Sequence, residues 1–133
     1  MANAPVLIDT SIWVEYFHGR DHQLVELVKD LIRNQRVVLC GVVLSELLAG
    51  VRARKDRDTL KHTLDALEYA EVSQGIWILA GEMSSNLRRQ GIRVPLTDVI
   101  VAALALENDY ELFTLDSHFD RIHELKFFDS ARV

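Results

Sequence analysis

The sequence predicts an α/β protein in which helices cover both faces of a central parallel sheet of four or five strands, a three-layer α/β/α sandwich. Short runs of apolar, β-branched residues alternate with longer segments whose apolar residues recur every three or four positions, the helical period. Strands that alternate with helices imply right-handed crossovers and therefore parallel strands. The 133 residues can bury one core, so we expect a single domain over residues 1–133.

The first half of the chain is expected to contain two strands and four helices. Residues 5–8 and 37–40 are the strands, and both are apolar throughout, as in strands with helices on either side. A helix is expected to begin near Thr10 and Ser11, which are potential caps, and another from Asp21. Two more are expected over residues 44–54 and 56–68, with Gly41 as a turn residue before them.

The second half is expected to contain two helices and one or two strands. Residues 74–90 form an amphipathic helix closed by Gly91. After Pro95, a run rich in alanine and leucine predicts a buried helix to residue 108, capped by Thr97 or Asp98. A strand follows at residues 110–114, and residues 125–128 are a further candidate.

Composition narrows the classes of protein that need to be considered. Apolar residues make up 49% and charged residues 26%, the balance of a folded globular protein. No apolar run approaches the ~20 residues that cross a bilayer, and the N-terminus lacks a basic region, so we expect a cytoplasmic protein without a membrane anchor. Cys40 is the only cysteine and stands in an apolar run, which favours a buried hydrophobic residue over a nucleophile.

The net charge of −5 argues against binding of nucleic acid through bulk positive charge. Basic residues nevertheless gather in two places, and either cluster would serve as a local contact for phosphates or simply as a solvated helix face. The clusters are Arg52, Arg54, Lys55, Arg57 and Lys61, and then Arg88, Arg89 and Arg93.

Four acidic residues are expected at one edge of the sheet, where ligands of open parallel sheets bind. Asp9 ends the first strand and Asp116 closely follows the strand at 110–114, while Glu46 and Asp98 stand near the starts of helices. Asp9 and Asp98 taken singly could equally be helix caps. Four carboxylates brought together would repel one another, whereas a divalent cation such as Mg²⁺ or Mn²⁺ takes oxygen ligands readily.

The segments that carry these carboxylates resemble known motifs. Residues 7–13, 44–50, 96–103 and 112–116 are similar, in order, to the four acidic motifs of PIN domains, in the branch of the VapC toxins. Together they span most of the chain. One departure is His118, followed by Phe119, at a place where family members often carry a further aspartate; Asp120 stands nearby and could compensate.

The resemblance implies a metal-dependent endoribonuclease that is the toxin of a toxin–antitoxin pair. By this resemblance Asp9 and Asp98 ligate Mg²⁺ or Mn²⁺ directly, and Asp116 completes the metal shell. Glu46 binds the metal through water or orients the attacking water, and Thr114 positions a ligand or water. Such a metal site would activate water for hydrolysis of a phosphodiester bond.

The resemblance also implies partners. RNA would be the substrate. Of the two basic clusters, we expect Arg52, Arg54 and Arg57 to contact it, because they follow Glu46 in the same helical region. A VapB-like antitoxin would lay a helical segment in a hydrophobic groove and send a cation, commonly arginine, into the acidic pocket. A homodimer is expected as well.

Two alternatives remain open at this point. One is a non-catalytic PIN-like domain that binds RNA or acts as a scaffold. The other is a phosphoaspartyl phosphatase or receiver domain, since both also place an aspartate after the first strand. The phosphatase would need a second aspartate two residues after Asp9, where this chain has Ser11, and the receiver would need an acidic pair at the first strand, where Asp9 stands alone.

Overall fold

A four-stranded parallel sheet forms the centre of the computed structural model, which describes residues 4–129. The strands stand in the order β3-β2-β1-β4, and Leu7 of the inner strand β1 is in register with Val38 on one side and Leu112 on the other. The expected α/β class is therefore confirmed. The strands are β1 (Val6–Ile8), β2 (Val37–Cys40), β3 (Glu68–Ala70) and β4 (Glu111–Phe113).

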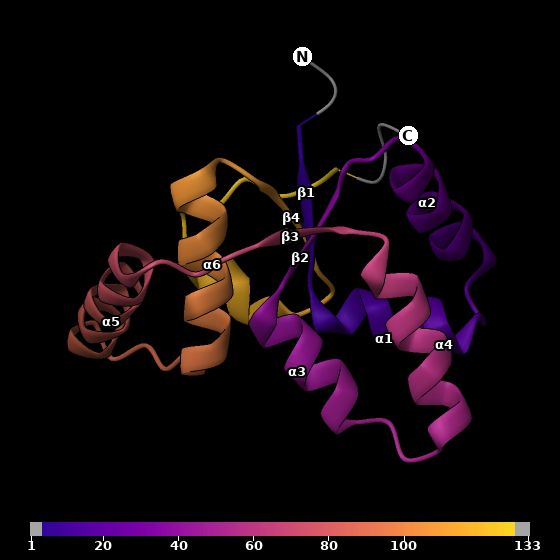
Figure 1. Ribbon diagram of the computed structural model, residues 1–133. Coiled ribbons are helices and arrows are strands. Elements are labelled where there is room, and N and C mark those ends of the chain that lie inside the picture. Colours follow the sequence, from indigo (N-terminus) through magenta and orange to yellow (C-terminus); the bar gives the residue numbers. More distant parts are fainter. Residues whose placement is uncertain (1–3, 130–133) are drawn as a thin grey trace.

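Helices cover both faces of this sheet because its strands are added first on one side of β1 and then on the other. The connections from β1 to β2 and from β2 to β3 run one way, and the connection from β3 to β4 runs back, so right-handed crossovers place their helices on opposite faces. In Figure 1, α5 and α6 accordingly lie on one side of the sheet and α2 and α4 on the other. The helices are α1 (Thr10–His18), α2 (His22–Arg33), α3 (Gly41–Ala49), α4 (Arg54–Asp65), α5 (Gln74–Arg89), α6 (Leu96–Asn108) and the short 3₁₀ helix η1 (Ser117–Arg121).

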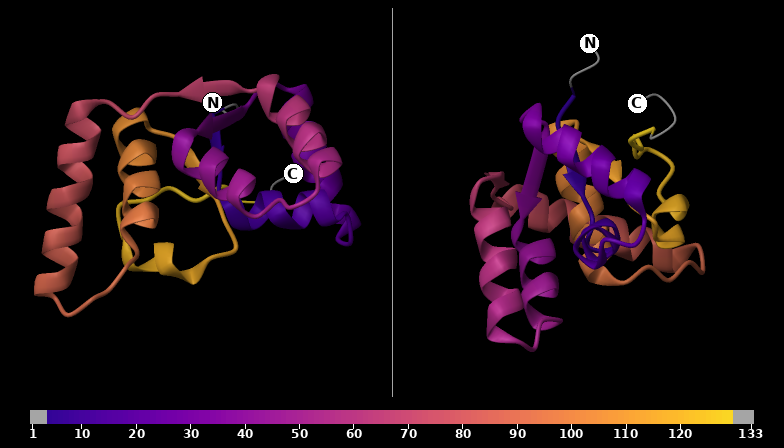
Figure 2. Two further views of the ribbon diagram at one scale, coloured as in Figure 1. Left: turned by 60° about the horizontal axis from the view of Figure 1, so that its bottom comes forward. Right: turned by 90° about the vertical axis from the view of Figure 1, so that its right-hand side faces the viewer.

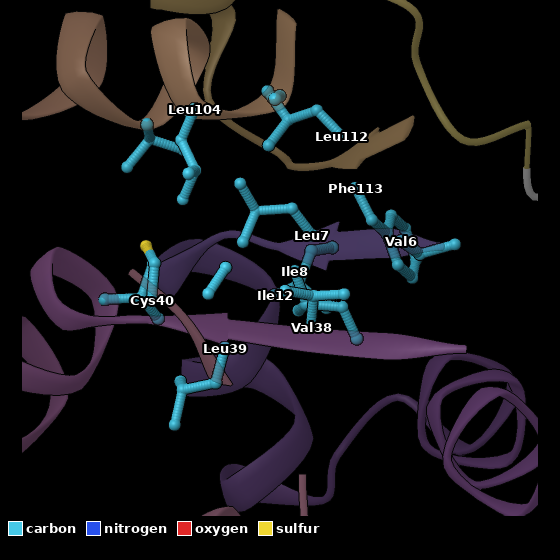
Figure 3. Packing of buried hydrophobic residues seen from close by; sticks show 14 of the residues in the cluster. Val6, Leu7, Ile8, Ile12, Val38, Leu39, Cys40, Leu104, Leu112 and Phe113 are labelled. Carbon is cyan, nitrogen blue, oxygen red and sulfur yellow. The ribbon is translucent and has the colours of Figure 1, made fainter. Parts of the chain in front are cut away.

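The core lies between β1, β4 and the central helix α6. Every residue of β1 is fully buried, and seven consecutive residues of α6, 99–105, are buried too. Figure 3 shows Leu7 of β1 facing Leu104 of α6 and Leu112 of β4. This packing fixes the positions of the last residues of β1 and β4 and of the first turn of α6. The candidate site is built from residues at these positions.

Two expected elements were wrong. A helix was expected over residues 56–68 and no strand directly after it, but α4 stops at Asp65, and Glu68 begins the edge strand β3, whose first two residues are exposed and give no apolar signal. Residues 125–128 were a candidate strand, but only Phe127 pairs with the sheet, in a single bridge to Leu112.

Two helix starts also differ from expectation. Gly41 was expected in a turn, but it is the first residue of α3, and a side chain there would meet the Tyr69 hydroxyl at 2.8 Å. The helix α6 begins at Leu96 after Pro95 and has no side-chain cap, so Asp98 lies in its first turn and does not cap it. Within residues 4–129 no helix is long and apolar enough to cross a membrane.

Candidate metal centre

The order of the strands changes direction between β1 and β4, because β2 lies on one side of β1 and β4 on the other. Open α/β sheets bind ligands at this position. Both strands run the same way, so the residues after them meet at one edge of the sheet. Asp9 follows β1, and its backbone N–H donates to the carbonyl of Phe113, the last residue of β4, at 2.9 Å. Asp9 and the loop that begins at Thr114 are therefore side by side.

Asp9 is a buried carboxylate held by two hydroxyl groups. Its side chain is only 5% exposed, and its Oδ2 atom accepts hydrogen bonds from the hydroxyls of Ser11 and Thr114, each at 2.8 Å. Oδ2 also accepts from the backbone N–H of Ser11, a longer contact of 3.4 Å that makes Asp9 the N-cap of α1. All these bonds go to Oδ2, so the network leaves Oδ1 for another partner.

The same two hydroxyls fix the loop after β4. The backbone N–H of Leu115 donates to the Ser11 hydroxyl at 3.0 Å, and that of Asp116 donates to the Thr114 hydroxyl at 2.9 Å. Each hydroxyl thus accepts one hydrogen bond from the loop backbone and donates one to Asp9. Because chains of hydrogen bonds polarise one another, Asp9 and Asp116 are positioned by one connected network.

Three further side chains gather next to Asp9. Oδ2 of Asp98 lies 3.0 Å from Nδ1 of His118, and Oδ1 of Asp116 lies 3.1 Å from the same nitrogen. One ligand atom from each of the three residues lies within 4.8 Å of the other two. Asp98 comes from the first turn of α6, Asp116 from the loop after β4, and His118 from η1.

The closeness of these carboxylates affects the titration of neighbouring groups. The pKa of Asp98 is raised above its ordinary value, first by burial and then by the charges of Asp116 and Asp9, against a lowering by the hydrogen bond with His118. The pKa of the Cys40 thiol is raised mainly by burial and further by the charges of Asp9 and Glu46. Cys40 is buried, as expected for a residue with a packing role.

Glu46 lies at the margin of this cluster. It is exposed on α3, and its Oε1 accepts a hydrogen bond of 2.6 Å from the Thr10 hydroxyl, on the residue directly after Asp9. The ion pairs and hydrogen bonds among residues 4–129 do not join Glu46 to Asp98, Asp116 or His118. The structure therefore brings Asp9, Asp98 and Asp116 together and places Glu46 beside them.

Glu46 also lines a groove between α1, α3 and α4. The groove has a volume of about 550 Å³, and apolar side chains dominate its wall, including Phe17, Leu47 and Leu60. Arg52 reaches the same groove. A mainly apolar groove thus adjoins the candidate site at Glu46.

The donor set fits a divalent metal ion. Carboxylate oxygens suit Mg²⁺ and Mn²⁺, and an imidazole nitrogen is accepted by Mn²⁺ more readily than by Mg²⁺. Sequence patterns left the contribution of His118 or Asp120 undecided; His118 belongs to the cluster, whereas Asp120 is exposed and outside it. Ser11 was not predicted to belong to the site. Its place two residues after Asp9 nevertheless allows its hydroxyl to donate a hydrogen bond to the Asp9 carboxylate.

Comparison with known proteins places the chain in a family. The model of the PIN domain matches residues 6–125. This chain is a PIN domain of the VapC branch. Ribonuclease VapC11 of Mycobacterium tuberculosis is 30% identical over 121 residues, which cover 88% of this chain and 90% of that protein. Ribonuclease VapC1 of Methanocaldococcus jannaschii is 27% identical over 127 residues, covering 93% and 87%.

Solved structures with the same fold include chains of VapBC complexes. This PIN domain resembles a chain of VapBC2 from Rickettsia felis bound to a promoter DNA fragment, with a TM-score of 0.81, 22% identity and coverage of 92% and 96%. A chain of DNA-bound VapBC from Salmonella typhimurium gives a TM-score of 0.82 with 19% identity and coverage of 96% and 98%. At this level of identity these structures support the fold.

Proposed function

We propose that this chain is a divalent-metal-dependent endoribonuclease and the cytoplasmic toxin of a toxin–antitoxin pair. The observation that carries the proposal is the convergence of Asp98, Asp116 and His118 within 4.8 Å beside the buried Asp9, in a chain whose curated relatives are named VapC ribonucleases. The retention of every acidic motif position argues against the alternative of a non-catalytic PIN-like RNA-binding domain.

Each side chain has a role in this proposal. Asp98, Asp116 and His118 offer ligand atoms to Mg²⁺ or Mn²⁺, and Asp9 offers its Oδ1. Thr114 orients Asp9 and the backbone of Asp116 through its hydroxyl.

Glu46 faces solvent beside the cluster and would hold or orient the attacking water, or bind the metal through water. A metal ion held here supplies a water that is nucleophilic near neutral pH and a counter-charge for the leaving oxygen. The chain's own residues then have two tasks: to orient the phosphodiester, and to accept the proton of the attacking water. Exposed Glu46 is suited to the second task because it reaches solvent.

Cleavage of single-stranded RNA by the purified protein tests this proposal. We expect cleavage with Mn²⁺ or Mg²⁺, loss of cleavage with EDTA, and loss of cleavage in Asp9→Asn. Asp65→Asn is a matched control, because Asp65 is an exposed residue at the end of α4. Equal cleavage by wild-type protein and Asp9→Asn would refute the assignment.

An antitoxin helix is the proposed occupant of the groove between α1, α3 and α4. The groove is lined mainly by apolar side chains and also by Glu46 and Asp56, so the apolar face of an amphipathic helix with one cationic side chain would suit it. Structures of the same fold come from VapBC complexes, which supports this assignment. Growth arrest that a co-encoded small protein fails to suppress would contradict it.

A homodimer is proposed as the resting assembly. Trp77 and Ile78 stand next to each other on α5 and are 51% and 55% exposed, which makes an apolar surface suited to a second copy. Trp13, by contrast, is fully buried in the core. The dimer is tested among the predictions in the Discussion.

A further inference from the structure

A second hollow adjoins the carboxylate cluster on the side of His118. Its volume is about 380 Å³, and its wall consists of Gly91, Ile92, Arg93, Ser117, His118 and Arg121. The first three belong to the loop between α5 and α6, and the others to η1. Figure 2 shows in both views that this loop and η1 lie side by side at the same end of α6. His118 therefore has one side toward the metal ligands and the other toward this hollow.

Two arginines give the hollow a positive charge. Arg93 and Arg121 are both exposed, and in the described part of the chain neither guanidinium has an ion pair or a hydrogen bond. Some other cations of the protein are paired, as Arg36 is with Glu111 and Lys126 with Asp109. Two free guanidinium groups in one hollow repel each other unless an anion lies between them.

The positive charge continues beyond the hollow. Arg88, at the end of α5, lines a neighbouring depression of about 400 Å³ together with Gly91 and Arg93. Arg88, Arg93 and Arg121 thus form a positively charged path that ends at His118, next to the carboxylates. In a protein of net charge −5, such a path provides the local potential that attracts a polyanion.

We infer that Arg93 and Arg121 bind a backbone phosphate of the RNA, next to the phosphodiester held at the metal centre. The inference rests on the proposed function. Guanidinium groups bind phosphate oxygens in a bidentate manner, and RNA repeats its phosphates along the strand. A strand with one phosphate at Asp98 and Asp116 must place a neighbouring phosphate close by, and the hollow beyond His118 is the adjacent positively charged place.

This assignment differs from the contacts expected from the sequence. Arg52, Arg54 and Arg57 were expected to contact RNA, and Arg52 lines the groove between α1, α3 and α4 on the side of Glu46. The two basic regions therefore flank different parts of the site. Substitutions in each region distinguish them.

Steady-state cleavage by Arg93→Gln, Arg121→Gln and the double variant tests the inference. We expect KM for single-stranded RNA to rise on the order of ten-fold in the double variant, with kcat within about two-fold of wild type, because the arginines position substrate. The dependence of log(kcat/KM) on log salt concentration should flatten by about 0.7 for each guanidinium removed. Binding of Mn²⁺, followed by calorimetry, should stay unchanged.

Two controls keep the test specific. Lys29→Gln removes one positive charge from α2 and should leave KM unchanged. Arg57→Gln removes a charge from the other basic cluster. Unchanged KM and salt dependence in the Arg93/Arg121 double variant would overturn the inference, as would a larger effect of Arg57→Gln than of the double variant.

A failure of the proposed function gives a different result. If wild-type protein with Mn²⁺ cleaves no RNA, the proposed function fails and the same variants are compared by fluorescence anisotropy with labelled RNA. Weaker binding by the double variant than by Lys29→Gln would still support the phosphate site. Equal binding would overturn it.

Discussion

Replacement of Thr114 by valine tests whether one hydroxyl organises the candidate site. Valine keeps the β-branched shape of threonine and replaces only its hydroxyl with a methyl group. Thr114→Val would remove the 2.8 Å hydrogen bond to Asp9 and leave the backbone N–H of Asp116 without its acceptor. Ser11 would remain as the only hydroxyl on Asp9 in this network.

The size of the effect follows from the charge on Asp9. A hydrogen bond to a charged group contributes about 1.5–3 kcal/mol, and a buried carboxylate cannot replace it easily with water. We therefore expect the free energy of unfolding to fall by about 1.5–3 kcal/mol. Since Asp9 and Asp116 would both lose orientation, metal affinity or kcat/KM should fall on the order of 10- to 100-fold.

Urea denaturation and Mn²⁺ calorimetry on the same preparations measure both effects. Thr114→Ser is the matched control, because serine keeps the hydroxyl and loses only a methyl group; it should stay within about 1 kcal/mol of wild type. If Thr114→Val and Thr114→Ser behave alike in stability and in metal affinity, the hydroxyl is not the organising group and the reasoning is refuted.

Three further predictions concern single side chains. Burial raises the pKa of the Asp98 carboxyl, so this group binds its proton more tightly in the folded chain than in the unfolded chain. Protonated Asp98 therefore adds to the free energy of unfolding below the ordinary pKa of 3.8, and this contribution is lost as pH rises through the raised pKa. Urea denaturation in EDTA at pH ~7 should accordingly show Asp98→Asn about 0.5–1 kcal/mol more stable than wild type; a less stable variant contradicts this. His118→Asp exchanges a nitrogen ligand for oxygen and should shift the ratio of Mn²⁺ to Mg²⁺ affinity toward Mg²⁺ by about ten-fold in calorimetry, and an unchanged ratio would exclude His118 as a ligand. Trp77→Glu should convert the dimer to a monomer in light scattering, and a monomeric wild-type protein at high concentration would remove the dimer proposal.

The sequence predicted the parts of the fold that rest on burial. Residues of β1 and β2 are apolar and buried throughout, and α6 is buried over most of its length, so their patterns are unambiguous. The edge strand β3 could not be predicted in the same way. It has three residues, of which Glu68 and Tyr69 are exposed, and its extended shape depends on pairing with Leu39 and its neighbours in β2.

The site residues that directly follow strands could be predicted from the sequence. Asp9 and Asp116 lie where parallel strands finish, and the structure places both there. The role of His118 was not predictable, because its contact with Asp98 joins residues 20 positions apart through the packing of η1 on α6. Gly41 is a similar case: a Cβ there would come within 2.8 Å of the Tyr69 hydroxyl, a contact that a local sequence pattern does not contain.

Calorimetric titration of Mn²⁺ into the metal-free protein tests the central claim most directly. We predict saturable binding by wild type, and affinity at least ten-fold lower in Asp98→Asn and in Asp116→Asn, because each loses a charged oxygen ligand. Asp65→Asn should match wild type. Equal Mn²⁺ affinity in all four proteins would show that the cluster beside Asp9 is not the metal centre, and would contradict the account.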